Sequence, residues 1–132
     1  MLTIYGSRGS SSANKVEYTA LALGLKYEYK TIDIQKDSKT EWYMKIHPAG
    51  KVPALDDDGF VLFESNAMMT YLADKKPGNL FPKDAKKRAI VNQWVEFVSL
   101  QPAQELGKMA FAKMSFRSVA RVPRLHNLFP RN

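Results

Sequence analysis

The residues best suited to chemistry lie in three short segments of the chain. The first is a serine cluster, Ser10 to Ser12, within a loop of sequence GSRGSSS. The second is Gly50-Lys-Val-Pro-Ala-Leu55, and the third is Phe63-Glu-Ser-Asn-Ala67 at a predicted helix start. Hydroxyls and free amides at a helix N-terminus favour an anion, because the helix dipole is positive there. The sequence therefore indicates an anionic ligand held near helix starts.

The 132 residues contain no cysteine, which limits the chemistry that the protein can perform. Disulfides, thiolate metal ligands and a cysteine nucleophile are all excluded. A reaction at sulfur would need a ligand that brings its own thiol. The two histidines, His47 and His126, stand in contexts typical of surface residues, so neither a Ser-His-Asp triad nor a metal site is predicted.

The elements that position these segments begin with a strand, a helix and a second strand. Residues 2–5 are rich in β-forming side chains, and the segment 26–34 alternates and is rich in Tyr, Thr and Ile. Between them, apolar residues recur at helical spacing after Ser11 or Ser12, either of which can serve as the N-cap. This order forms a βαβ unit, which requires parallel strands and a right-handed crossover.

The second half of the same domain is predicted as two strands and a helix. The elements expected after residue 37 are a short helix over 38–46, strands over 51–55 and 60–63, and a helix over 66–74. Asp56-Asp-Asp-Gly59 supplies the turn between the strands, and Ser65 is the expected cap of the last helix. A βαβ unit followed by a helix and a ββα unit predicts an α/β fold, a thioredoxin-like domain, followed by a truncated all-α segment.

The rest of the chain is predicted to be helical and then irregular. Asp84 caps a long helix that runs to about residue 100 and carries a broad apolar stripe, which would be exposed without a partner. A further helical piece is expected over 103–114. The predicted divisions are a domain over 1–75, a linker over 76–83, the start of a helical domain over 84–114 and an irregular basic tail over 115–132.

The net charge of +7 is concentrated at the C-terminus. Five basic residues and no acidic one follow residue 112, which leaves 15 basic and 13 acidic residues before it. A solvated or disordered tail is the favoured interpretation over a nucleic-acid arm, because the tail has few interleaved aromatic residues. No apolar run approaches the roughly eighteen residues of a membrane span, and no secretory signal is visible. Neither nucleic acid nor membrane is an expected partner, and the cytoplasm is the expected compartment.

Residues 1 to about 100 resemble a glutathione transferase of the serine-type, theta-like or phi-like classes. The resemblance is carried by the spaced pair GKVPAL and ESNA, together with the serine cluster before the first helix. It implies a homodimeric enzyme that takes glutathione as co-substrate and conjugates it to small hydrophobic electrophiles. In such an enzyme a serine hydroxyl stabilises the glutathione thiolate.

The resemblance also implies which residues hold glutathione. The Val52-Pro53 bond would be cis, which leaves the main chain of Val52 as a free edge that pairs with the cysteinyl backbone. Ser65 and the helix amides would bind the γ-glutamyl carboxylate, and Glu64 would meet the ammonium. Lys39 and Lys51 match positions that bind the glycyl carboxylate.

Several residues compete for the thiol itself. Aligned on the first helix, Ser10 occupies the family's catalytic position, with Ser11 and Ser12 as neighbours. Tyr5 is a further alternative, because other classes use a tyrosine near the end of the first strand. Lowering a thiol pKa by ~2 units needs about 2.7 kcal/mol, which a charged hydrogen bond and a helix end can supply.

The sequence departs from the family pattern after residue 114. A full transferase continues for about another hundred residues of helices, which build most of the electrophile pocket. The tail SFRSVARVPRLHNLFPRN lacks amphipathic period and acidic residues, and we interpret it as a truncated, frame-altered or divergent end. The alternative to a transferase is therefore a truncated or non-catalytic module for glutathione binding or assembly.

Overall fold

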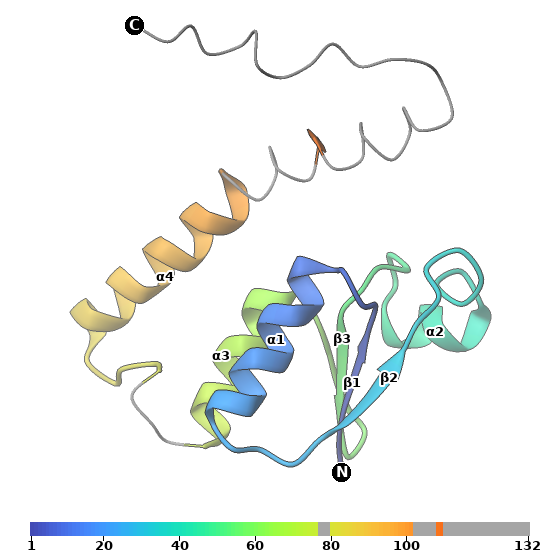
Figure 1. Cartoon of the computed structure of the whole chain (residues 1–132). Coiled ribbons are helices and arrows are strands. Elements are labelled where there is room, and N and C mark those ends of the chain that lie inside the picture. The colour runs from blue at the N-terminus through green and yellow to red at the C-terminus, as the bar shows by residue number, and fades with distance from the viewer. Residues whose placement is uncertain (77–79, 102–107, 110–132) are drawn as a thin grey trace, which may run out of the picture. The chain divides into compact units, whose positions relative to one another are not determined.

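The computed structural model describes residues 1–76, 80–101 and 108–109. Within these residues the chain forms four strands and four helices (Figure 1). In chain order they are β1 (Leu2–Gly6), α1 (Ser11–Ala22), β2 (Glu28–Thr31), α2 (Glu41–Ile46), β3 (Ala54–Asp57), β4 (Phe60–Phe63), α3 (Ser65–Lys75) and α4 (Ala85–Leu100). The predicted thioredoxin-like order of elements, followed by a helical segment, is confirmed.

The four strands form one mixed sheet in the order β2-β1-β3-β4. β1 pairs in parallel with β2, as a βαβ unit requires, and in antiparallel with β3. β3 and β4 form a hairpin whose two-residue turn, Asp58-Gly59, has positive φ angles of 53° and 89°. All five residues of β1 are buried, because β1 has a paired strand on each side and side chains packed against both faces.

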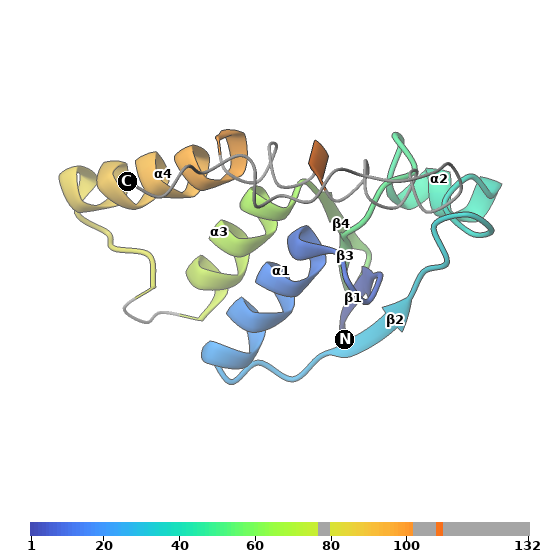
Figure 2. The same ribbon diagram turned by 45° about the horizontal axis from the view of Figure 1, so that its top comes forward.

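Helices cover both faces of the sheet. α1 and α3 run side by side against one face (Figure 2), where Ile4, Val16, Leu55, Met68 and Leu72 form the main core. The smaller core on the other face contains residues of β1, α2 and β3, among them a fully buried tyrosine of α2. Successive residues of a strand point to opposite faces, so β1 contributes to both cores.

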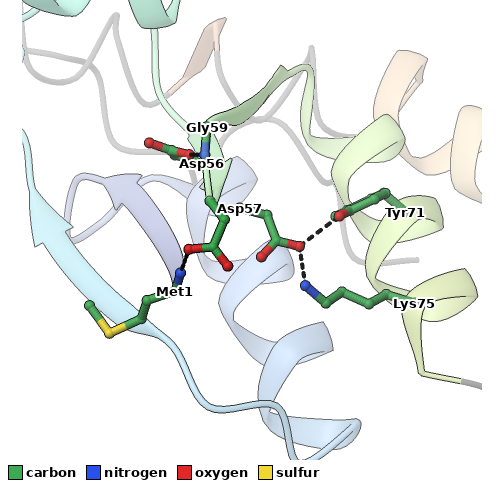
Figure 3. Close-up of polar contacts among 7 residues, drawn as sticks. Met1, Asp56, Asp57, Gly59, Tyr71 and Lys75 are labelled. Atoms are coloured by element: carbon green, nitrogen blue, oxygen red, sulfur yellow. Dashed lines mark hydrogen bonds and ion pairs between the residues drawn. The ribbon is translucent and has the colours of Figure 1, made fainter.

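A polar cluster joins α3 to the end of the β3–β4 hairpin (Figure 3). The buried carboxylate of Asp57 accepts hydrogen bonds from the hydroxyl of Tyr71, at 2.6 Å, and from the ammonium of Lys75. These bonds, that of Lys75 first, hold the pKa of Asp57 below its usual value. The N-terminal ammonium of Met1 pairs with the neighbouring Asp58. Both contacts lie at the end of β3 opposite to Pro53.

The observed elements differ from the predicted ones mainly at their ends. The second strand is confined to Glu28–Thr31, because β1 offers partners only from Thr3 to Gly6. The third strand starts at Ala54 rather than at residue 51, since Pro53 has no N–H for the ladder. The helix predicted over 38–46 is α-helical only from Glu41, after a run of turns.

The long helix α4 begins as predicted, with the Asp84 carboxylate accepting from the Lys87 amide at 3.0 Å. Its large apolar side chains, among them Ile90, Trp94 and Phe97, are exposed. The chain divides at Val91, within α4. Most of the helical piece expected over 103–114, and all of the tail over 115–132, lie outside the described residues. No helix in the described part of the chain is long and apolar enough to cross a membrane.

Candidate functional site

The register of the sheet brings the three candidate segments to one edge. Tyr5 of β1 pairs with Ala54 of β3, and Ala54 pairs with Phe63 of β4. These three paired residues lie next to the candidate segments. The serine loop comes shortly after Tyr5, Pro53 directly precedes Ala54, and Glu64 directly follows Phe63. Pairing across the sheet therefore places the ends of all three segments together, although they are far apart in sequence.

Two helix N-termini meet the same edge of the sheet. α1 starts after the serine loop and α3 starts after β4, and the two helices pack side by side (Figure 1). Near their starts, the Lys15 ammonium donates to the side-chain oxygen of Asn66 at 2.6 Å. Because both dipoles are positive at these ends, the edge favours an anionic ligand.

Ser10 is the N-cap of α1, which corrects the predicted cap at Ser11 or Ser12. Its backbone is extended, with ψ of 112°, and its Oγ accepts from the Ala13 amide at 3.3 Å. A hydroxyl that accepts in this way keeps its own proton to donate. Ser11 is the exposed first residue of the helix and Ser12 is half-buried. The three serines thus lie in one turn, and only Ser10 has the geometry of the cap.

Tyr5, the alternative partner for a thiol, lies in the smaller core. It is buried, and its ring centroid is 6.3 Å from those of both Trp42 and Tyr43. The ammonium of Lys30 lies 5.7 Å from the same ring. These contacts are those of a packing residue on the face covered by α2.

Glu64 and Ser65 join β4 to α3 through an uncommon backbone conformation. Glu64 is the N-cap residue with φ of 70°, a left-handed conformation that costs free energy in a residue other than glycine. The expected cap at Ser65 is wrong, because Ser65 is already the first helical residue, and it is buried. The Glu64 side chain is exposed and makes no capping bond. Such strain is typical of functional sites, where it fixes side-chain direction.

The segment before β3 presents main-chain groups and two lysines. The Val52-Pro53 bond is cis, and Val52 is half-buried beside the buried Pro53. Lys51 and Lys39 are exposed, and the Lys39 ammonium donates to the carbonyl of Ala49 at 3.0 Å. Both cations therefore belong to the same loop region as Val52.

Gly50 allows the loop before β3 to pack tightly. Its φ of +56° is left-handed, and a Cβ placed on it would lie 2.4 Å from the carbonyl oxygen of Ser38. Any side chain there would therefore strain the backbone and clash with it.

His47 lies beside the end of β4, and its burial corrects the prediction that it is a surface residue. The structure buries it, with its ring centroid 5.2 Å from that of Phe63, and its Nδ1 has no hydrogen-bond partner among the described residues. Burial lowers the pKa of His47, while the nearby Glu64 carboxylate opposes that shift. Its position before a proline gave no signal of burial, because the burial depends on β4. His126 lies outside the described residues.

The described residues show no cluster of three or more side chains able to hold a metal ion. The residues that the structure gathers in this region carry a serine hydroxyl at a helix cap, the half-buried main chain of Val52, an exposed carboxylate and two exposed ammonium groups.

Comparisons with known proteins agree with this fold. The family model for the glutathione S-transferase N-terminal domain matches residues 1–74. A delta-class glutathione transferase from Nilaparvata lugens is 37% identical over 92% of this chain and 58% of that one, with a TM-score of 0.83. An epsilon-class glutathione S-transferase from the housefly, Musca domestica, is 33% identical over 93% of this chain and 58% of that one, also with a TM-score of 0.83.

A theta-class glutathione S-transferase from Xanthomonas axonopodis pv. citri, solved with glutathione bound, is 32% identical with a TM-score of 0.73. The match covers 78% of this chain and 50% of that one. The chain thus spans about half the length of the structures that it resembles.

Proposed function

The chain belongs to the glutathione S-transferase family, and we propose that it binds glutathione at the sheet edge where β1, β3 and β4 meet the starts of α1 and α3. The bound thiolate would then attack small hydrophobic electrophiles, so that the protein acts as a glutathione transferase. The observation that carries the proposal is the pairing of Tyr5 with Ala54 and of Ala54 with Phe63, which gathers the three candidate segments.

Each part of glutathione has a matching group at this edge. The main chain of Val52 pairs with the cysteinyl backbone as an added strand. The γ-glutamyl carboxylate lies at the start of α3 with Ser65, and its ammonium meets Glu64. Lys51 and Lys39 attract the glycyl carboxylate as point charges.

Ser10 donates its hydroxyl hydrogen bond to the glutathione sulfur. The Ala13 amide occupies one acceptor position of this hydroxyl, which leaves its proton available for donation. The start of α1 adds positive potential at the sulfur. Together these interactions lower the thiol pKa, and no proton-transfer triad is needed. Ser11 is the second choice for the same role.

The remaining features of a transferase are proposed on the family's pattern. We place the glutathione-binding domain at residues 1–75, the linker at 76–83 and the start of the helical domain at 84–114. A cytoplasmic homodimer is the expected form. The exposed apolar side chains of α4, such as Trp94 and Phe97, are consistent with a need for further covering surface.

A second candidate function is a glutathione-binding module without turnover. It is favoured by one observation, that the family model matches residues 1–74, which contain every residue proposed to bind glutathione. The helices that complete the electrophile pocket in the family follow the first long helix.

Retention on glutathione-agarose, followed by a conjugation assay with a chloronitrobenzene electrophile, separates these functions. Retention with turnover supports the transferase, and retention alone supports the binding module. The Glu64→Gln variant should elute at a lower glutathione concentration than the wild type. The matched control is Glu41→Gln, an exposed glutamate of α2 paired with Lys45, which should elute unchanged. Failure of the wild-type chain to be retained would contradict both functions.

A further inference from the structure

Tyr43 is a buried tyrosine that contacts the loop of the proposed glutathione site. It lies on α2, its side chain is 0% exposed, and its hydroxyl donates to the carbonyl oxygen of Lys51 at 2.7 Å. We propose that Tyr43 is a positioning residue: by holding the Lys51 carbonyl, it aims the main chain of Val52 at the cysteinyl part of glutathione. This inference rests on the proposed function.

Tyr43 acts on Val52 through the peptide group that joins Lys51 to Val52. The Lys51 carbonyl and the Val52 N–H belong to one planar unit, so fixing the carbonyl fixes the N–H. This peptide bond is trans, and its C=O and N–H therefore point in opposite directions. Because Tyr43 holds the carbonyl toward α2, the Val52 N–H points away from α2. The proposal places the cysteinyl backbone of glutathione on that side, paired with Val52 as an added strand.

Contacts around Tyr43 make it a rigid support. Its ring centroid lies 5.4 Å from that of Trp42 and 6.3 Å from that of Tyr5, both in edge-on arrangements, and Ala54 belongs to the same buried cluster. Burial raises the pKa of Tyr43 to about 12, so the phenol remains a donor at neutral pH. Packing thus holds the ring in place, and the hydrogen bond from its hydroxyl restrains the Lys51 carbonyl.

The loop before Lys51 is held at a second point. The Lys39 ammonium donates to the Ala49 carbonyl at 3.0 Å, and the Gly50 amide donates to the His47 carbonyl at 2.7 Å. These bonds fix the loop up to Gly50. Tyr43 then holds the carbonyl of Lys51, the residue directly before Val52.

The Tyr43→Phe variant tests the hydroxyl alone, because it keeps the ring and its packing. Its matched control is Tyr71→Phe, which removes another phenol hydrogen bond, that to Asp57 at the opposite end of β3. Isothermal titration calorimetry of the full chain with glutathione gives Kd for each variant. Thermal unfolding and the thiol pKa of bound glutathione are measured on the same samples.

We expect Tyr43→Phe to raise Kd roughly three- to tenfold, as befits the loss of one hydrogen bond. The thiol pKa of bound glutathione should stay at its wild-type value, since Ser10 is untouched. Tyr71→Phe should lower the unfolding temperature without changing Kd.

Two outcomes would overturn the role of Tyr43 alone: an unchanged Kd in Tyr43→Phe, or equal rises in both variants. Absence of glutathione binding by the wild type would refute the proposed function as well.

Discussion

Replacing Ser10 with alanine separates the two tasks that the structure gives to its hydroxyl. The Oγ atom caps α1 by accepting from the Ala13 amide, and we propose that the hydroxyl proton is donated to the glutathione thiolate. Alanine removes both interactions and leaves the backbone unchanged. The variant should therefore lose stability and raise the pKa of the bound thiol.

The two losses have different sizes. Loss of an N-cap hydroxyl typically costs about 1 kcal/mol, within a range of roughly 0.5–2 kcal/mol. The capping distance of 3.3 Å is long, so we expect a value toward the lower end. A hydrogen bond to a charged group contributes about 1.5–3 kcal/mol, which corresponds to roughly 1–2 units of thiol pKa. The thiol pKa is thus the more sensitive measure.

Ultraviolet absorbance of the thiolate, recorded across pH with bound glutathione, gives the pKa, and urea unfolding gives the stability. The Ser11→Ala variant is the control, because Ser11 is exposed and does not cap the helix. A bound thiol whose pKa is the same in Ser10→Ala and in the wild type would refute the role of Ser10. A shift seen in Ser11→Ala instead would transfer the role to that residue.

Three further predictions concern the stability of the scaffold. Gly50→Ala should destabilise the chain in urea more than Gly9→Ala does, because both have positive φ but only Gly50 has a main-chain oxygen 2.4 Å from the added Cβ. Equal losses of stability in the two variants would contradict the predicted clash at Gly50. Burial lowers the pKa of His47, so the unfolded chain binds a proton first and stability should fall as pH drops through about 6.5. The stability of His47→Gln, measured by unfolding at several pH values, should not fall over this range. A fall of the same size as in the wild type would show that another group causes it. The bond from Lys75 lowers the pKa of Asp57, so it stabilises the fold above about pH 4 and is lost at lower pH. Acid unfolding followed by circular dichroism should be shallower in Lys75→Met; an unchanged curve would count against this pair.

Local sequence patterns predicted the order of elements because each element carries its own signal. The hairpin is an example, since Asp58-Gly59 favours the tight turn that the structure shows. The start of β3 also has a local cause, the missing N–H of Pro53, but the prediction placed the strand over the whole apolar run from residue 51. Strand ends depend on what the neighbouring strand offers, and sequence periodicity alone does not contain that information.

The sequence indicated which residues are candidates for the site, but not the contacts that support them. The three serines are chemically equivalent in sequence, and only the extended backbone of Ser10 distinguishes the cap. The burial of His47 and the hydroxyl contact of Tyr43 both arise from tertiary packing, on β4 and on the loop before β3. In the sequence, a tyrosine in a short helix indicates only a packing residue. Its hydrogen-bond partner depends on the tertiary fold and cannot be predicted from the helix alone.

Amide chemical-shift mapping of the full chain, titrated with glutathione, tests most directly whether this sheet edge holds the tripeptide. We predict saturable shifts at the amides of Val52 and Ser65 and at the start of α1, with the Asp58-Gly59 turn unaffected. Shifts that do not saturate, or that gather around the turn at the opposite end of β3, would contradict the proposed site.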